Sequence, residues 1–175
     1  MRRTSLTAAL CAAGFLLGAS VGLTQGASSA ASTPRVSASI TSEEQAFLDL
    51  INEERAERGL SPLKLDLLLV GVAREHSREM CEKDYFDHIS PTSGLRTPMQ
   101  RYLRALPKRP PYACVGENLF YCSVVDVARG HRALMESPGH RANILFPRFR
   151  QCGVGIYKSP SGEFWVTQMF LTNEG

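Results

Sequence analysis

After its first thirty residues, the 175-residue chain lacks the short motifs that mark many familiar hydrolases. Residues 31–175 contain no HExxH, which places two zinc ligands on one helix face, and no GxSxG, which presents a nucleophilic serine. No two cysteines are separated by two to four residues, the spacing that structural zinc sites prefer. There is also no basic run interleaved with aromatic residues, so we do not expect a nucleic-acid partner.

The first thirty residues differ in composition from the rest of the chain. Arg2 and Arg3 precede an apolar run from Leu6 to Leu23, and small residues follow up to Ala30. This pattern predicts a secretory signal peptide over residues 1–30. A membrane anchor is the alternative, but the run is short and is interrupted by glycine and alanine. We therefore expect a mature chain without a transmembrane span, located outside the cell or in a periplasm.

Loss of the signal would leave a nearly neutral chain with an even number of cysteines. The formal charge falls from +3 to about +1, because two arginines and no acidic residues are removed. The remaining cysteines are Cys81, Cys114, Cys122 and Cys152. In an oxidising compartment they predict two disulfides. Of the three pairings only Cys114–Cys122 is disfavoured, because an extended segment between them would hold the two sulfurs too far apart.

Hydrophobic periodicity and turn residues divide the remaining chain into helices and strands. Helices are expected at residues 42–59, 66–83, 98–106 and 124–135, the first of them opened by a capping box at Ser42-Glu43-Glu44-Gln45. Strands are expected at residues 115–120, 151–157 and 163–171, the last two joined as a hairpin. Residues 31–40 read as a disordered leader, and residues 41–175 as one domain of the α+β class.

One segment, ESPGHRANIL at residues 136–145, combines turn chemistry with a titratable ring. Ser137 is a good N-cap and Pro138 suits the first helical position, so His140 is expected in the first turn of a helix. Taken alone, the segment could simply begin a helix with an exposed histidine. His88 in DHISP and Glu117 in GEN could likewise be ordinary solvated residues.

Read together and in order, these segments resemble the CAP superfamily of cysteine-rich secretory, antigen 5 and pathogenesis-related 1 proteins, in particular its short bacterial secreted members with an SCP-like extracellular domain. The matching segments are INEER with GLSPL, residues 73–80, YFDH, GENL, ESPGHRANIL and GVG. The resemblance covers about residues 44–171. It implies an α–β–α sandwich, with a small antiparallel sheet between helical layers.

The resemblance also implies a cleft lined by two histidines and two acids. The matching residues are His88, Glu117, Glu136 and His140. Neutral imidazoles bind zinc, and a nearby carboxylate can orient them, so His88 and His140 are the expected ligands of a divalent cation such as Zn²⁺. Without metal, the same four groups could act as a general acid and base.

Family members are linked to metal binding, to sterol and lipid binding and to proteolysis, so the resemblance implies no single reaction. We expect a secreted, monomeric binding module for a divalent metal and a small apolar, lipid-like or envelope ligand, without turnover. The alternative is an extracellular hydrolase that acts on peptides or a cell-envelope polymer. A third interpretation is purely structural, with the four residues tying helix ends to the sheet.

Three other side chains are expected to have structural roles. His76 is expected to be packed and hydrogen-bonded within a helix, and His131 to be exposed among charged residues. Trp165 belongs by alternation to a core strand.

Overall fold

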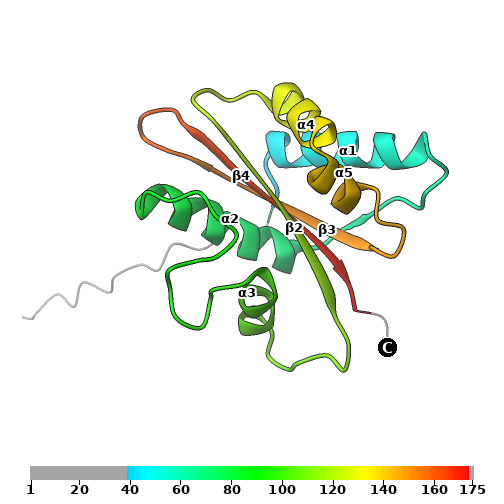
Figure 1. Cartoon of the computed structure of the whole chain (residues 1–175), viewed down its shortest axis with the longest axis horizontal. Helices are drawn as coiled ribbons and strands as arrows, with labels where there is room; N and C mark the ends of the chain where they lie inside the picture. The colour runs from blue at the N-terminus through cyan, green and yellow to red at the C-terminus, as the bar shows by residue number, and fades with distance from the viewer. Residues whose placement is uncertain (1–38, 174–175) are drawn as a thin grey trace, which may run out of the picture. The chain divides into compact units, whose positions relative to one another are not determined.

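The structure is a computed structural model that describes residues 39–173. The expected signal peptide and nearly all of the expected leader lie outside these residues. A four-stranded sheet forms the middle layer, with α2 and α3 on one side and α1, α4 and α5 on the other (Figure 1). The predicted α–β–α sandwich is therefore confirmed.

Five helices and four strands make up this part of the chain. The helices are α1 (Ser42–Ala56), α2 (Leu67–Glu82), α3 (Pro98–Ala105), α4 (Val127–Glu136) and α5 (Pro138–Ile144). The strands are β1 (Lys64–Leu65), β2 (Cys114–Cys122), β3 (Gln151–Lys158) and β4 (Phe164–Thr172). None of the helices between residues 39 and 173 is long and apolar enough to cross a membrane.

The sheet has the order β1-β3-β4-β2, which leaves β2 at one edge. Strands β3 and β4 form the predicted antiparallel hairpin, and β2 also pairs antiparallel with β4. Strand β1 was not predicted: its two residues, which follow the turn at Pro62, pair parallel with β3. Two residues are too few to show an alternating pattern, so only the tertiary pairing reveals this strand.

Helix α1 begins at Ser42 as expected, but its N-cap is Thr41 rather than Ser42, and its capping box joins Thr41 to Glu44. The backbone N–H of Glu44 donates to Thr41 Oγ1, and the backbone N–H of Thr41 donates to Glu44 Oε2 at 2.8 Å. The Glu44 carboxylate is buried and also accepts a hydrogen bond from Arg74 Nε at 2.7 Å. One side chain thus caps α1 and fastens it to α2.

Two glycines of the GVG motif allow α2 to lie directly on β3. A Cβ atom at Gly155 would overlap the backbone N of Arg74 and lie 2.6 Å from Ala73 Cβ. A Cβ atom at Gly153 would overlap the backbone of Leu69 and Val70 in the same way. The motif is therefore explained by close helix–sheet packing, which only residues without a side chain permit.

All four cysteines of the described residues are free thiols, so the prediction of two disulfides is wrong. Cys114 and Cys122 occupy the two ends of β2, as the extended-segment argument required. Cys152 lies on β3, and the intervening β4 places it about 10 Å from β2, beyond disulfide reach. Cys81 packs with Trp165 in a different cluster from the one that holds Cys114 and Cys152. The fold therefore separates Cys152 from the two cysteines of β2, and Cys81 from Cys114 and Cys152.

His131 is buried, with only 5% of its surface exposed, so the prediction of an exposed residue is wrong. Helix α4 begins at Val127, after an Asp126 N-cap, and packs His131 to within 3.7 Å of Glu54 on α1. The charged residues next to His131 in the sequence are exposed. Packing against α1, rather than local composition, therefore determines that His131 is buried.

Candidate functional site

The site is built at the edge of the sheet, where β2 carries Glu117. His88 reaches this carboxylate from the loop after α2, and its ring Nδ1 lies 2.8 Å from Glu117 Oε1. Because an ionised carboxylate can only accept hydrogen bonds, Nδ1 carries the proton and donates it to Glu117. In the neutral ring, the lone pair of Nε2 is then left available.

Arg101 on α3 holds the other oxygen of the same carboxylate. Its Nη2 donates to Glu117 Oε2 at 2.6 Å, and both side chains are almost completely buried. Its Nη1 donates to the backbone carbonyls of His88, Leu95 and Arg96, each at 3.1 Å. Arg101 therefore positions both the carboxylate and the loop that carries His88. No sequence pattern around Arg101 indicates this role.

His76 on α2 is the third side chain that lies beside the Glu117 carboxylate. Its Nε2 lies 3.2 Å from the carbonyl oxygen of Asp87 and 3.9 Å from Glu117 Oε1. Burial lowers the pKa of this imidazole, so it is neutral near physiological pH. The prediction of a packed, hydrogen-bonded residue is confirmed, but its place beside Glu117 was not foreseen.

The helix that carries His140 is fastened to β2 by asparagines. Asn118 Nδ2 donates to the backbone carbonyl of His140 at 3.1 Å, and Asn143 Nδ2 donates to the carbonyl of Glu117 at 3.1 Å. At the far end of α5, the buried Arg55 donates to the carbonyl of Ile144 at 2.8 Å. The GEN and SPGHRAN segments thus form one hydrogen-bonded unit, with His140 in the first turn of α5 as predicted.

The two histidines of the cleft have opposite pKa shifts. The hydrogen bond to Glu117 raises the pKa of His88, whose side chain is 46% exposed. Burial lowers the pKa of His140, and positive charge on His88 lowers it further. Since a charge on one ring affects the other, the two imidazoles lie in one electrostatic environment.

Glu136 is not joined to this unit in the structure. It is the last residue of α4 and is exposed. Across residues 39–173, no hydrogen bond or ion pair links it to His88, Glu117 or His140. The structure therefore brings together three of the four predicted cleft residues by direct or backbone contacts, and adds His76 and Arg101.

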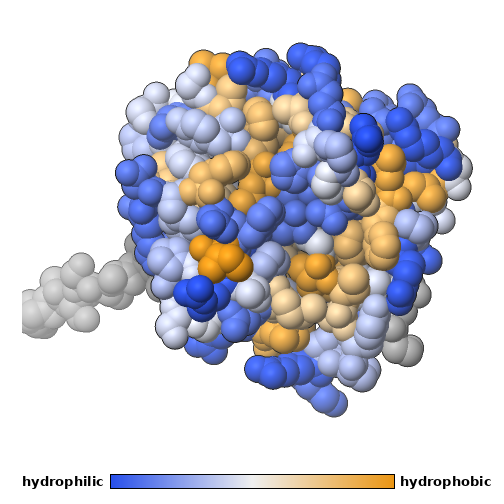
Figure 2. All heavy atoms as spheres, in the orientation of Figure 1, coloured by the Kyte–Doolittle hydropathy of each residue, from blue (hydrophilic) through white to orange (hydrophobic). Residues whose placement is uncertain are grey.

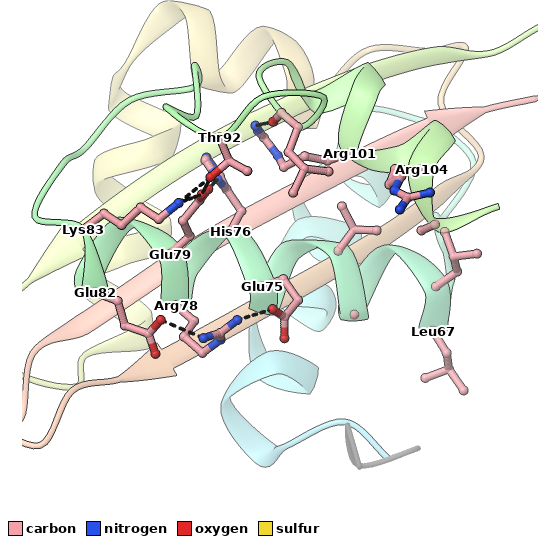
Figure 3. Close-up of a pocket in the computed structure, with 15 residues that line it drawn as sticks. Leu67, Glu75, His76, Arg78, Glu79, Glu82, Lys83, Thr92, Arg101 and Arg104 are labelled. Carbon is pink, nitrogen blue, oxygen red and sulfur yellow. Dashed lines mark hydrogen bonds and ion pairs between the residues drawn. The ribbon is translucent and has the colours of Figure 1, made fainter. Parts of the chain in front are cut away.

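A cavity of about 650 Å³ lies between α2 and α3 (Figure 3). His76 and Arg101 line it together with apolar residues, among them Leu68, Val72 and Leu95. Its rim is charged: a row of ion pairs along α2 joins Arg78 to the two glutamates on either side of it (Figure 3). The cavity thus has an apolar interior that touches the buried side of the site.

The face of the molecule drawn in Figure 2 carries apolar patches separated by hydrophilic residues. Apolar area on this face is therefore not gathered into the single large patch that marks many protein–protein interfaces.

The side chains of the cleft suit a metal ion only as an open site. No group of three or more histidine, cysteine, aspartate or glutamate side chains between residues 39 and 173 is arranged to hold a metal. Two imidazoles are borderline-soft ligands that suit Zn²⁺, and a carboxylate on the second ring nitrogen is a usual supporting group. The donor set therefore fits a cation with two protein ligands and water in its remaining positions.

Comparison with known proteins gives consistent matches. The family model described as "CAP: Cysteine-rich secretory protein family" matches residues 48–170. The uncharacterized protein YkwD of Bacillus subtilis is 36% identical over 146 residues, which cover 79% of this chain and 51% of that protein. A second Bacillus subtilis relative is matched over 35% of its own length. The chain therefore spans about half the length, or less, of the curated relatives it matches.

Two solved structures are similar in fold. One is an extracellular protein containing an SCP domain from Bacillus anthracis, with a TM-score of 0.63, 33% identity, and coverage of 73% of this chain and 39% of that one. The other is NaASP2, whose crystal structure is described as "with Zn2+", with a TM-score of 0.54 and 14% identity over 75% of this chain and 80% of that one.

Proposed function

Because the chain belongs to the cysteine-rich secretory protein (CAP) family, we propose that it is an exported binding protein whose cleft holds a divalent cation, Zn²⁺, between His88 and His140. The observation that carries this proposal is the 2.8 Å contact of His88 Nδ1 with Glu117. A carboxylate that fixes the tautomer and orientation of a histidine is the usual companion of a zinc ligand. Glu117 would then be a positioning residue, and Nε2 of His88 would be the atom that binds the metal.

The surroundings of Glu117 favour binding over hydrolysis. A general base must be free to take a proton from water, but both oxygens of Glu117 are engaged, one by His88 and one by Arg101. A bound cation would polarise water or a ligand oxygen, as an open zinc site does. The residues of the cleft would hold and orient that cation.

The cavity between α2 and α3 supports the second part of the proposal, a small apolar ligand. Its volume of about 650 Å³ falls within the range of small-molecule sites, and its interior is mainly apolar. Because His76 and Arg101 belong to both the cavity wall and the surroundings of Glu117, an occupant would touch the groups that support the cleft.

Zinc calorimetry on the metal-free protein tests the proposal. We expect one Zn²⁺ per chain for the wild type, and at least about tenfold weaker binding for His88→Ala and for His140→Ala, because each removes one of two protein ligands. His131→Gln changes a histidine outside the cleft and serves as the control. Glu136→Gln should also bind as the wild type does, since this residue is exposed and, within residues 39–173, forms no hydrogen bond or ion pair with the other three.

Two outcomes would contradict the metal site. The first is the absence of measurable heat with the folded wild type. The second is equal affinity of the wild type and the variant that carries both His88→Ala and His140→Ala.

A further inference from the structure

An aromatic surface lies further along β2, on the face that also carries Glu117. It is formed by Phe86, Tyr121 and Trp165, whose ring centroids are 4.4–6.4 Å apart and whose planes are inclined by 52–58°. Phe86 and Tyr121 are 51% and 41% exposed. The tilted rings border a shallow pocket of about 520 Å³. Phe86 and Tyr121 therefore present exposed aromatic surface at the pocket, and the buried Trp165 packs against both.

The charged groups on the wall of this aromatic pocket are all acidic. Asp84 and Glu163 line it, and no lysine or arginine does so. The hydroxyl of Tyr121 donates to Glu163 Oε1 at 2.7 Å, and this hydrogen bond lowers the pKa of the carboxyl, which stays ionised. The thiol of the neighbouring Cys81 has a pKa raised by burial and then by the negative charges of Glu163, Glu82 and Asp84. The local potential is thus negative.

The basic residues nearest in the sequence are engaged elsewhere. Lys83 Nζ binds Glu79 at 2.7 Å on the side of the cavity between α2 and α3. Lys158 Nζ binds Glu43 at 2.5 Å. Neither cation neutralises the carboxylates of the aromatic pocket.

We propose that the aromatic pocket binds an organic cation of the alkylammonium or quaternary ammonium class. The faces of aromatic rings attract such cations through the ring quadrupole, and the two carboxylates add Coulomb attraction. A neutral apolar molecule would gain area burial alone and would leave the carboxylates uncompensated.

This site does not depend on the proposed zinc site, because neither His88 nor His140 lines the aromatic pocket. Binding experiments with a chelator present therefore test it separately. A negative result there would leave zinc binding unaffected, and a failed zinc titration would not bear on the aromatic pocket.

Trp165 is the only tryptophan of the chain, so its fluorescence reports on this pocket alone. The probe is choline chloride, titrated into the full mature chain with EDTA, and with sodium chloride adjusted to keep the ionic strength constant. The matched neutral molecule is 3,3-dimethylbutan-1-ol, which has the same shape without the charge. We expect a saturable change with choline in the millimolar range and none with the alcohol.

Variants locate the binding. Phe86→Ala, Asp84→Asn and Glu163→Gln should each weaken choline binding by about fivefold, because each removes one exposed ring or one charge. Asparagine tolerates the backbone of Asp84, so that variant folds even if another does not. Glu57→Gln removes an exposed carboxylate at the C-cap of α1 and should leave the affinity unchanged.

Three results would overturn the proposal. An equal response to the neutral alcohol would show a merely apolar site. Saturation by N-acetylglucosamine but not by choline would show a glycan site. Unchanged choline affinity in all three pocket variants would place the binding elsewhere.

Discussion

Replacement of Gly155 by alanine is expected to lower the free energy of unfolding by about 3 kcal/mol or more, because a methyl group there overlaps the backbone of α2. The helix cannot move away from β3 without opening the core between them. Chemical denaturation in urea, followed by circular dichroism, measures the loss. This is the largest effect of a single methyl group that the fold predicts.

The matched control is Gly71→Ala, which adds the same methyl group to α2 in open space. It should stabilise the protein by roughly 0.5–1 kcal/mol, because alanine is the better helix former. Equal stability of Gly155→Ala and the wild type would mean that α2 does not lie against β3 as described.

Replacement of Glu117 by glutamine is expected to affect stability and metal binding together. It leaves the buried guanidinium of Arg101 without its carboxylate, which should cost about 3 kcal/mol in the free energy of unfolding. It also removes the anion that holds His88, so zinc should bind roughly 10–100-fold more weakly. Unfolding in urea and calorimetry with zinc measure the two effects.

The Glu117→Gln variant also tests why the pKa of His88 is raised. The wild-type His88 pKa is raised by Glu117, so this pair stabilises the fold below the ordinary histidine pKa, and the contribution disappears as pH rises through the folded value. In Glu117→Gln, the His88 pKa measured by NMR titration should move down towards its ordinary value. A pKa that does not change would assign the shift to another group.

Two comparisons isolate the pair with Arg101. Glu57→Gln makes the same chemical change on an exposed side chain and should leave stability within about 0.5 kcal/mol of the wild type. Arg101→Met should be destabilising alone, but its cost and that of Glu117→Gln should not add in the double variant, since each change removes the same interaction. Stability costs of the two single variants that add fully in the double variant would contradict the pairing of Arg101 with Glu117.

The sequence predicted those parts of the fold that depend on local patterns. Helices α1, α2 and α3, the β3–β4 hairpin and the first turn of α5 follow from periodicity, capping residues and turn residues. The predicted start of α4 was three residues too early, because the apolar pair Val124-Val125 reads as helical although Asp126 is the N-cap. Both valines are exposed.

The parts that sequence reasoning missed depend on contacts between distant segments. Arg101 and Glu117 lie on α3 and β2, and no spacing rule connects them. His76 was correctly predicted to be packed, but its proximity to Glu117 arises only when α2 lies across the sheet. The disulfide prediction failed for the same reason, since an even count of cysteines says nothing about which thiols the sheet separates.

The central claim is that His88 and His140 share one cation, with Glu117 behind His88. Crystals grown with zinc chloride and measured on both sides of the zinc absorption edge test it most directly. We expect an anomalous peak within bonding distance of His88 Nε2 and of the His140 ring. A well-ordered cleft without such a peak, or two imidazoles directed into separate parts of the molecule, would contradict the claim.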